Sequence, residues 1–276
     1  MKTLQILFTS MKLIKPLKIL TFTFSLVSAT FTFAQEDSDL GALITDRPDA
    51  TESSTAMPKG FLQIETGAFY ESFEENNIKT EDFTYNTMLM RYGLLDNLEL
   101  RLGYNYTNSK TRFNGTEIES VTSFSPLLIG FKTSINEEKG IMPEIGFLGH
   151  LYLPFSVNKE IRPKNTGVDF RFAFSHTLSE KSSLSYNLGA AWENDNAQAA
   201  YLYSVSYGYS FNNKIGAYIE FYGDLPENNK ANHLWDTGLT YLISDNFQLD
   251  ATIGSSLTKG QDILISAGFS FRIPKS

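Results

Sequence analysis

The chain lacks cysteine, and its 276 residues include only three histidines and two tryptophans. The absence of cysteine excludes a disulfide framework and any metal site built from thiolates. The three histidines, His150, His176 and His233, are too far apart to form a histidine-rich metal motif. The sequence also contains no glycine loop that would cradle a phosphate, so no cofactor and no metal are predicted.

Long hydrophobic runs are missing as well, apart from one near the start of the chain. Four lysines among the first 18 residues precede an apolar run from Ile19 to about Phe33, which small residues follow. The run is about 15 residues long, whereas a membrane-spanning helix needs roughly 20. The pattern therefore predicts a secretory signal peptide over residues 1–34 rather than a membrane anchor.

The sequence also has no surplus of basic residues. Residues 1–34 hold four lysines and no acids, which leaves 19 basic and 31 acidic residues in the rest of the chain, a formal charge of −12. Nucleic acid is therefore not an expected partner. An exported chain without disulfides must gain its stability from a large core, a bilayer or both. Because no later segment could form a spanning apolar helix, a membrane would be entered as strands.

A pattern of strict alternation is present over residues 88–108. Leu98, Leu100 and Leu102 alternate with Glu99 and Arg101 after a turn-forming Asp-Asn pair at 96–97. Successive side chains of a strand point to opposite faces. The pattern predicts a β-hairpin with one apolar and one charged face, and it raises the question of whether the apolar face meets a protein core or lipid.

The same alternation repeats from residue 61 to the end of the chain. It predicts about twelve strands, at approximately 61–73, 82–94, 98–108, 119–134, 141–156, 167–178, 183–194, 199–211, 215–224, 232–243, 247–256 and 262–273. Short turns follow every second strand, at 96–97, 136–140, 179–181, 212–214 and 244–246, and longer polar connections lie at 74–81, 109–118, 157–165 and 226–231. Short turns at one end and longer loops at the other are typical of outer-membrane barrels.

These features predict an all-β fold, an antiparallel transmembrane barrel of about 12 strands in the outer membrane of a Gram-negative bacterium. An even number of strands places both termini in the periplasm, with residues 35–60 as a periplasmic N-terminal segment and residues 61–276 as the barrel domain. A secreted β-sandwich or lipocalin-like barrel is the alternative. Small polar residues and glycines on the second face argue against it, since the surface of a soluble domain is usually richer in Lys and Glu.

Four segments resemble a family of bacterial outer-membrane proteins named for the meta-pathway of phenol degradation and described as transporters. They are ITDRPDATESSTAMPKGFLQIETG (44–67), MRYGLLDNLELRLG (90–103), IGFKTSINEEKGIMPEIGFLGHLYLP (129–154) and DTGLTYLISDNFQLDATIG (236–254). The resemblance implies an outer-membrane barrel that passes small molecules, with aromatic ones as candidates, and it supplies no catalytic residues. The last strand also resembles the assembly signal of such barrels, which makes the barrel-assembly machinery and outer-membrane lipid the expected partners.

If the apolar face meets lipid, the charges of the other face line the lumen. These candidates are Glu65, Glu71, Arg91, Glu99, Arg101, Lys132, Glu144, Asp169, Arg171, Glu193, Glu220, Asp224, Asp236, Asp250, Asp262 and Arg272, with His150 as a neutral member. They would select solutes as rings of pore charges do. The alternative is that they pair with one another and fill a narrow interior without conduction. Glu220, Asp236 and Asp250, on three consecutive strands, form an acidic patch without obvious basic partners.

The segment around Asp46, Arg47 and Asp49 immediately precedes the first strand. It could fold back into the lumen as a plug, with Arg47 reaching the acidic patch, or it could be a simple tether with a turn at Pro48.

The sequence is consistent with three functions. The first is a passive channel for an unknown small solute, with aromatic or organic acids as candidates, in which residues 74–81 and 157–165 screen entry. The second is a closed barrel that serves as a structural or adhesive surface component. The third, a lipid hydrolase, would need His233 and Ser255 to act together, and no GxSxG motif surrounds either residue.

Overall fold

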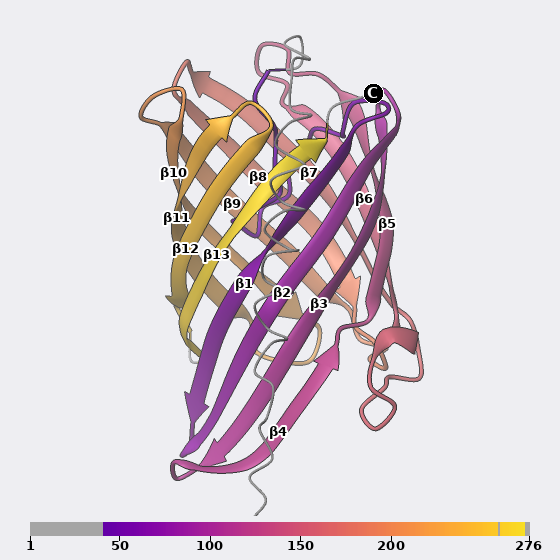
Figure 1. Cartoon of the computed structure of the whole chain (residues 1–276), viewed down its shortest axis with the longest axis vertical. Helices are drawn as coiled ribbons and strands as arrows, with labels where there is room; N and C mark the ends of the chain where they lie inside the picture. The colour runs from indigo at the N-terminus through magenta and orange to yellow at the C-terminus, as the bar shows by residue number, and fades with distance from the viewer. Residues whose placement is uncertain (1–40, 259, 274–276) are drawn as a thin grey trace, which may run out of the picture. The chain divides into compact units, whose positions relative to one another are not determined.

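The computed structural model describes residues 41–258 and 260–273, so the predicted signal peptide lies outside the described residues. The described part is built almost entirely from antiparallel strands that form one sheet (Figure 1). The strands are β1 (Leu62–Glu75), β2 (Ile78–Leu95), β3 (Leu98–Phe113), β4 (Thr116–Phe124), β5 (Leu127–Asn136), β6 (Glu144–Leu153), β7 (Gly167–Ser179), β8 (Ser182–Trp192), β9 (Ala200–Ser210), β10 (Ile215–Pro226), β11 (Asn232–Ser244), β12 (Phe247–Ser256) and β13 (Gln261–Ile273).

The sheet closes on itself because β1 pairs with β2 on one side and with β13 on the other. Strands that are consecutive in the sequence pair with each other, except β4 and β5. On the side away from β2, β3 has two partners along its length. Its half nearer the Asp96–Asn97 turn pairs with β5, and its other half pairs with β4. Since β4 and β5 share one position in the ring, the barrel has 12 strands, which confirms the predicted fold and strand number.

The predicted strand over residues 119–134 is divided between β4 and β5 at Ser125 and Pro126. Proline has no N–H to donate to a neighbouring strand, so it interrupts the ladder. Ser125 keeps both bonds to β3 across the break: its N–H donates to the Asn105 carbonyl at 2.8 Å, and its hydroxyl accepts from the Asn105 N–H at 2.8 Å. The alternation could predict the strand but not this interruption.

The prediction of long connections at residues 74–81 and 109–118 is wrong. β1 and β2 continue to a two-residue turn at Asn76–Asn77, and β3 and β4 meet at Asn114–Gly115. All four turn residues have positive φ, between 48° and 79°. Turns of this kind match the twist of paired strands, and Asn and Gly adopt them most easily. β1 to β4 therefore project beyond the other strands as an extended ribbon (Figure 1), and residues 74–81 do not form a loop that screens entry.

Most of the remaining connections follow the predicted alternation in length, but the connection between β5 and β6, residues 137–143, is longer than the turn predicted at 136–140. The turns after β2, β7, β9 and β11 are short, whereas residues 154–166, which begin with the short 3-10 turn η2 (Pro154–Ser156), form a long connection between β6 and β7. Among the described residues, no helix is long and apolar enough to cross a membrane.

The two faces of the sheet have opposite polarity. On β9, Tyr201, Val205 and Tyr207 are exposed on the outside, while Ser204 and Ser206 are buried inside. The largest fully buried side chains are mostly polar or charged: Gln63, Glu65, Arg91, Glu99, Lys132, Asn187, Glu220 and, as the apolar exception, Leu148. A polar interior within an apolar exterior is the pattern of an outer-membrane barrel, and it is the reverse of a lipocalin-like barrel.

An arginine in the middle of the apolar face tests which medium surrounds it. Ile219, 44% exposed, lies near the middle of β10, and Ile215, 40% exposed, lies on the same face at the turn end. We expect Ile219→Arg to lower the free energy of unfolding in lipid vesicles by about 2–4 kcal/mol and Ile215→Arg to lower it by about 0–1 kcal/mol. The difference arises because the cost of a charge falls towards the bilayer interface. Denaturant titration in vesicles measures both, and equally small effects would contradict a hydrocarbon surrounding.

Candidate functional site

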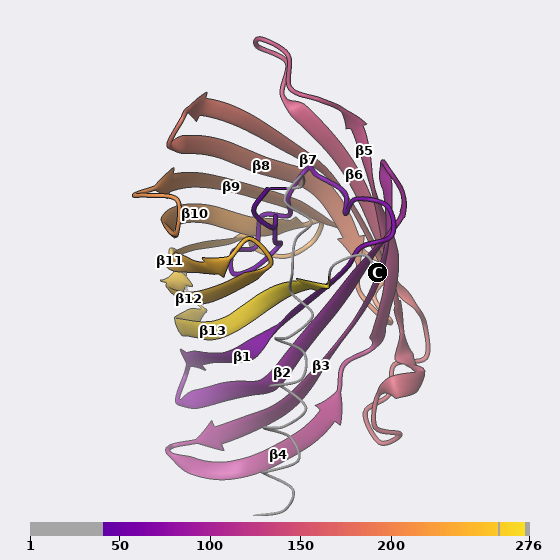
Figure 2. The ribbon, with the colours of Figure 1, turned by 45° about the horizontal axis from the view of Figure 1, so that its top comes forward.

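Residues 41–60, which we call the inner segment, enter the ring of strands from the end that carries the short turns (Figure 2). There the Leu43 N–H donates to the Asp245 carbonyl, in the turn after β11, at 2.8 Å. Hydrogen bonds join the inner segment to side chains of β1, β2, β3, β5, β6, β7, β8, β9, β10, β12 and β13. The segment is therefore bonded to strands on all sides of the ring.

Asp46 of the inner segment lies among three cations of the barrel, Arg91 on β2, Arg101 on β3 and Lys132 on β5, which we call the basic cluster. Its carboxylate is 2.8 Å from Lys132 Nζ, 3.2 Å from Arg91 Nη1 and 3.3 Å from Arg101 Nη2. Burial by itself raises the pKa of Asp46, but the three cations outweigh burial and hold it well below the usual range. Asp46 is thus an ionised group that links three strands.

The other charges around the basic cluster complete its pairing. Arg91 contacts Glu65 and Glu99 at 2.9 Å each, and Arg101 contacts Glu52 of the inner segment at 2.8 Å. Buried charges are costly unless they are paired and hydrogen-bonded. The barrel contributes three cations and two carboxylates here, and the inner segment contributes two more carboxylates. The structure therefore brings these predicted lumen residues together as an ion-pair network.

Arg47 points the opposite way, towards β12. Its Nη2 lies 2.8 Å from Asp250 Oδ1 and its Nε 3.3 Å from Oδ2, a two-point contact of the kind that guanidinium groups make with carboxylates. Gly67 and Gly268, which face each other in the β1–β13 register, leave the space for it. A Cβ at either glycine would lie 2.4–2.6 Å from Arg47 Nη2, so a larger residue there would displace the guanidinium.

The three residues of the predicted acidic patch lie in three different environments. Asp250 is paired with Arg47, and Glu220 accepts bonds from the Ala50 N–H at 2.7 Å and from the Thr51 hydroxyl. Asp236 lies directly opposite Glu220 in the β10–β11 register. It is 3% exposed, and its Oδ1 has no hydrogen-bond partner among the described residues.

Asp49 of the inner segment joins this acidic region. It accepts a bond from the Ser206 hydroxyl at 3.1 Å. Burial raises the pKa of Asp49 well above its usual range, the nearby Glu220 and Asp236 raise it further, and the bond from Ser206 opposes them only in part. Asp46 and Asp49, three residues apart, are therefore in opposite electrostatic surroundings.

The remaining predicted residues also lie inside the barrel. His150 Nδ1 is 2.8 Å from Asp169, which also accepts from the Tyr152 hydroxyl at 3.1 Å. Arg171 donates to a carbonyl of the inner segment at 3.3 Å, and Glu144 accepts from one of its threonine hydroxyls at 2.8 Å. The structure thus places Arg171 and Glu144 at the contact with the inner segment, whereas His150 and Asp169 pair with each other across β6 and β7.

Two predicted lumen residues do not line the lumen. Glu193 is exposed in the connection after β8. Asp262 is exposed on the outside of β13, because a register shift opposite Ser72 and Phe73 turns Gln261 inward instead. Alternation alone does not reveal such a bulge. The predictions also missed Asn187, whose side-chain amide bonds both the N–H and the carbonyl of Glu52, at 2.7 and 2.9 Å.

The geometry does not assemble a serine hydrolase from the proposed pair. Ser255 donates its hydroxyl to the carbonyls of Gln261 and Asp262, at 3.2 and 2.9 Å. His233 Nδ1 instead lies 2.6 Å from the Tyr203 hydroxyl. A nucleophile must be within hydrogen-bond reach of its base, and the hydroxyl of Ser255 is bonded elsewhere.

Cavities lie on both sides of the inner segment. The loop-side cavity, about 500 Å³, extends from Pro48 and Asp49 to residues at the ends of β10 to β13 that carry the longer connections. The turn-side cavity, about 360 Å³, is also lined by Pro48 and Asp49, and it reaches the short turn at 179–181. Because these two residues line both cavities, the inner segment is the partition between them.

Comparison with known proteins places the chain among outer-membrane barrels. The sequence model of the family described as "Putative MetA-pathway of phenol degradation" matches residues 45–273. The fold is similar to that of an outer membrane channel from Pseudomonas putida F1, with a TM-score of 0.64 and 14% identity over 83% of this chain and 100% of that one. It is also similar to the translocator domain of the autotransporter NalP from Neisseria meningitidis, with a TM-score of 0.50 and 10% identity over 92% and 97%. No curated protein matches the chain in sequence.

Removal of the Asp46 charge tests whether the basic cluster holds the inner segment. Asp46→Asn leaves three buried cations with fewer partners, which costs on the order of 3 kcal/mol. We expect the amides of residues 44–57 to exchange hydrogen roughly 100-fold faster in detergent micelles, measured by mass spectrometry. Asp195→Asn, in the exposed connection after β8, is the matched control, and equal exchange in both variants would show that Asp46 does not anchor the segment.

Proposed function

The chain belongs to the family described as "Putative MetA-pathway of phenol degradation", and from this membership we propose that it is a passive outer-membrane channel for small organic solutes, regulated by its inner segment. The observation that supports this most directly is the partition at Pro48 and Asp49, with a cavity on each side. A solute that crosses the barrel there has to pass, or displace, the inner segment.

The driving force in this proposal is the gradient of the solute itself. The charges along the path set the preference for a solute, as they do in other pores. The family name and the apolar lining of the loop-side cavity both favour organic, and in particular aromatic, molecules.

The orientation follows from the rule for bacterial barrels, in which short turns face the periplasm and longer connections face the exterior. The inner segment and the end of β13 both lie at the short-turn end, where Arg272 donates to the Gly41 carbonyl at 2.7 Å. In this orientation the inner segment enters from the periplasm and the loop-side cavity opens to the exterior.

The resting channel is narrow, because the inner segment is bonded on every side and its ion pairs are buried. Conduction therefore requires part of the segment to move. The section between Pro48 and Thr51 is the best candidate, since Asp49 there lies beside two carboxylates rather than beside a cation.

A reversible cross-link tests this motion, and the absence of native cysteine makes the experiment clean. The hydroxyl oxygens of Thr51 and Ser204 are 2.8 Å apart, so cysteines at these positions are within reach of a disulfide. We expect Thr51→Cys with Ser204→Cys to conduct several-fold less in planar bilayers when oxidised and to recover after reduction. The two single-cysteine variants are the controls, and equal conductance in both redox states would contradict a moving partition.

Deletion of the segment gives the complementary result. We expect a chain without residues 36–56 to show larger conductance steps than the full barrel. Unchanged steps would mean that the segment lies outside the conducting path. A lack of steps in the full chain, the deletion variant and the reduced cross-link variant alike would favour a closed barrel that serves a structural or adhesive role.

A further inference from the structure

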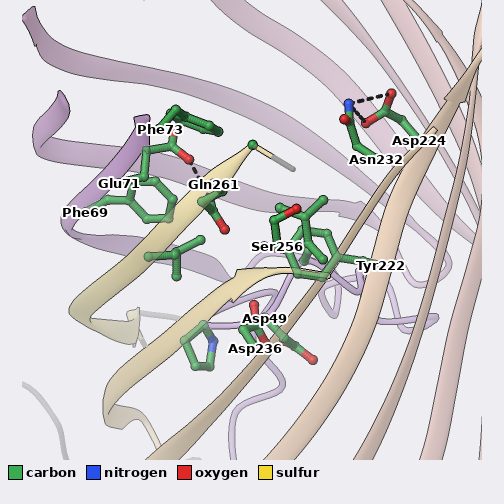
Figure 3. A pocket seen from close by; sticks show the side chains of 15 residues that line it. Asp49, Phe69, Glu71, Phe73, Tyr222, Asp224, Asn232, Asp236, Ser256 and Gln261 are labelled. Atoms are coloured by element: carbon green, nitrogen blue, oxygen red, sulfur yellow. Dashed lines mark hydrogen bonds between the residues drawn. The ribbon is translucent and has the colours of Figure 1, made fainter. Parts of the chain in front are cut away.

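The loop-side cavity combines an apolar wall with several acidic side chains. Its apolar lining comes from Phe69 and Phe73 on β1, Tyr222 on β10, Leu234 on β11 and Leu264 on β13. Its acidic lining consists of Asp49, Glu71, Asp224 and Asp236, and no Lys, Arg or His is among the described residues that line it. Figure 3 shows Asp49 and Asp236 at one end of the cavity, with Phe73, Asp224 and Asn232 towards the other.

The acids near the mouth already have partners. Glu71 accepts from the Gln261 side chain at 2.7 Å, and Asp224 accepts from the Asn232 side chain at 3.0 Å. These bonds come from neutral amides, so they satisfy oxygen atoms without balancing the charge. Glu71 and Asp224, at the mouth of the cavity, therefore have hydrogen-bond partners within the chain but no cation beside them in the cavity lining.

Asp236 at the inner end of the cavity is different. It is 97% buried, it faces the cavity, and its Oδ1 has no hydrogen-bond partner among the described residues. Leaving a buried polar atom unsatisfied costs as much as the hydrogen bond it lacks, and more for a charged group. The buried acids of the basic cluster differ from Asp236, because each carboxylate there contacts Arg or Lys.

Two further carboxyl groups surround Asp236. Glu220 is its direct cross-strand partner, which places their Cβ atoms about 5 Å apart. Asp49 approaches from the inner segment and lines the same cavity. The one arginine that the inner segment contributes nearby, Arg47, is committed to Asp250 at 2.8 Å. A cation that enters the cavity would therefore supply a donor to Asp236 Oδ1 and a positive charge beside Asp236 and Asp49.

The apolar walls indicate what kind of cation fits. The described residues hold no group of three or more His, Cys, Asp or Glu side chains arranged to bind a metal ion. Phe69, Phe73 and Tyr222 offer aromatic faces, which attract organic cations and pack against apolar bodies. A volume of about 500 Å³ is within the usual range for a small-molecule site.

We propose that the loop-side cavity is a binding site for a small primary ammonium ion with an aromatic body, whose nitrogen donates to Asp236 and Asp49 and whose ring lies among Phe69, Phe73 and Tyr222. The site is the first that a solute meets on the proposed path, so the inference rests on the proposed channel for its biological use. The binding itself needs only the folded barrel.

Equilibrium binding tests the site with 2-phenylethylammonium as the probe and 2-phenylethanol as its neutral counterpart. The full-length mature barrel in detergent micelles is titrated by calorimetry. Because a hydrogen bond to a charged group is worth more than a neutral one, we expect the ammonium ion to bind about 10- to 100-fold more tightly than the alcohol. Equal affinity for the two probes would overturn the proposal.

Substitutions then assign the binding to the predicted carboxylates. We expect Asp236→Asn to weaken binding of 2-phenylethylammonium at least about tenfold and to leave binding of 2-phenylethanol nearly unchanged. Asp262→Asn, an exposed acid on the outside of β13, is the matched control and should bind as the wild type does. If Asp236→Asn does not fold, Asp49→Asn serves instead, because Asp49 lies on the inner segment and not on a strand of the barrel.

The outcomes separate this inference from the channel. Preferential binding of the ammonium ion that is lost in Asp236→Asn or Asp49→Asn supports the site even if planar bilayers show no conductance. Conductance without any preference for the ammonium ion overturns the site and leaves the channel standing. Unchanged binding in both folded variants would also overturn it.

Discussion

The buried contact between Asp46 and the three cations of the basic cluster is the interaction on which the interior of this barrel depends. Arg91, Arg101 and Lys132 come from three strands, and the two glutamates beside them cannot balance them alone. Because an unpaired charge in a low-dielectric interior is costly, the barrel needs an acidic segment inside it. Asp46 and Glu52 meet this need, and their position determines where the rest of the inner segment runs.

From this anchor the inner segment divides the lumen into two electrostatically different regions. Around Asp46 every buried charge has a partner of opposite sign. Past Arg47, which is held by Asp250 in the space left by Gly67 and Gly268, the segment turns towards carboxylates instead. There Asp49 lies with Glu220 and Asp236, and the loop-side cavity begins. The region that is least satisfied by the chain itself is thus the region open to a solute.

The outer face of the barrel could be predicted in detail because it follows a local rule. Alternation along β9, β12 and most of β13 predicted the outward residues, but it did not reveal the break at Ser125 and Pro126. The turns were harder. Asn76–Asn77 and Asn114–Gly115 are surrounded by charged and polar residues that resemble loops, yet these residues form long strands that project from the barrel. Asp262 was placed inside the barrel because a single bulge opposite β1 reverses the faces at the start of β13.

The sequence by itself determined most of the strands, their apolar and polar faces, the all-β class and the family, because each of these is carried by patterns of neighbouring residues. Only the tertiary structure decided which charges meet. Arg47 and Asp250 are 203 residues apart, and Asp46 and Lys132 are 86 apart. Such pairs depend on the register of every strand around the ring and on the path of the inner segment across it. The same closure left Asp236 Oδ1 without a hydrogen-bond partner among the described residues, which no local pattern could have shown.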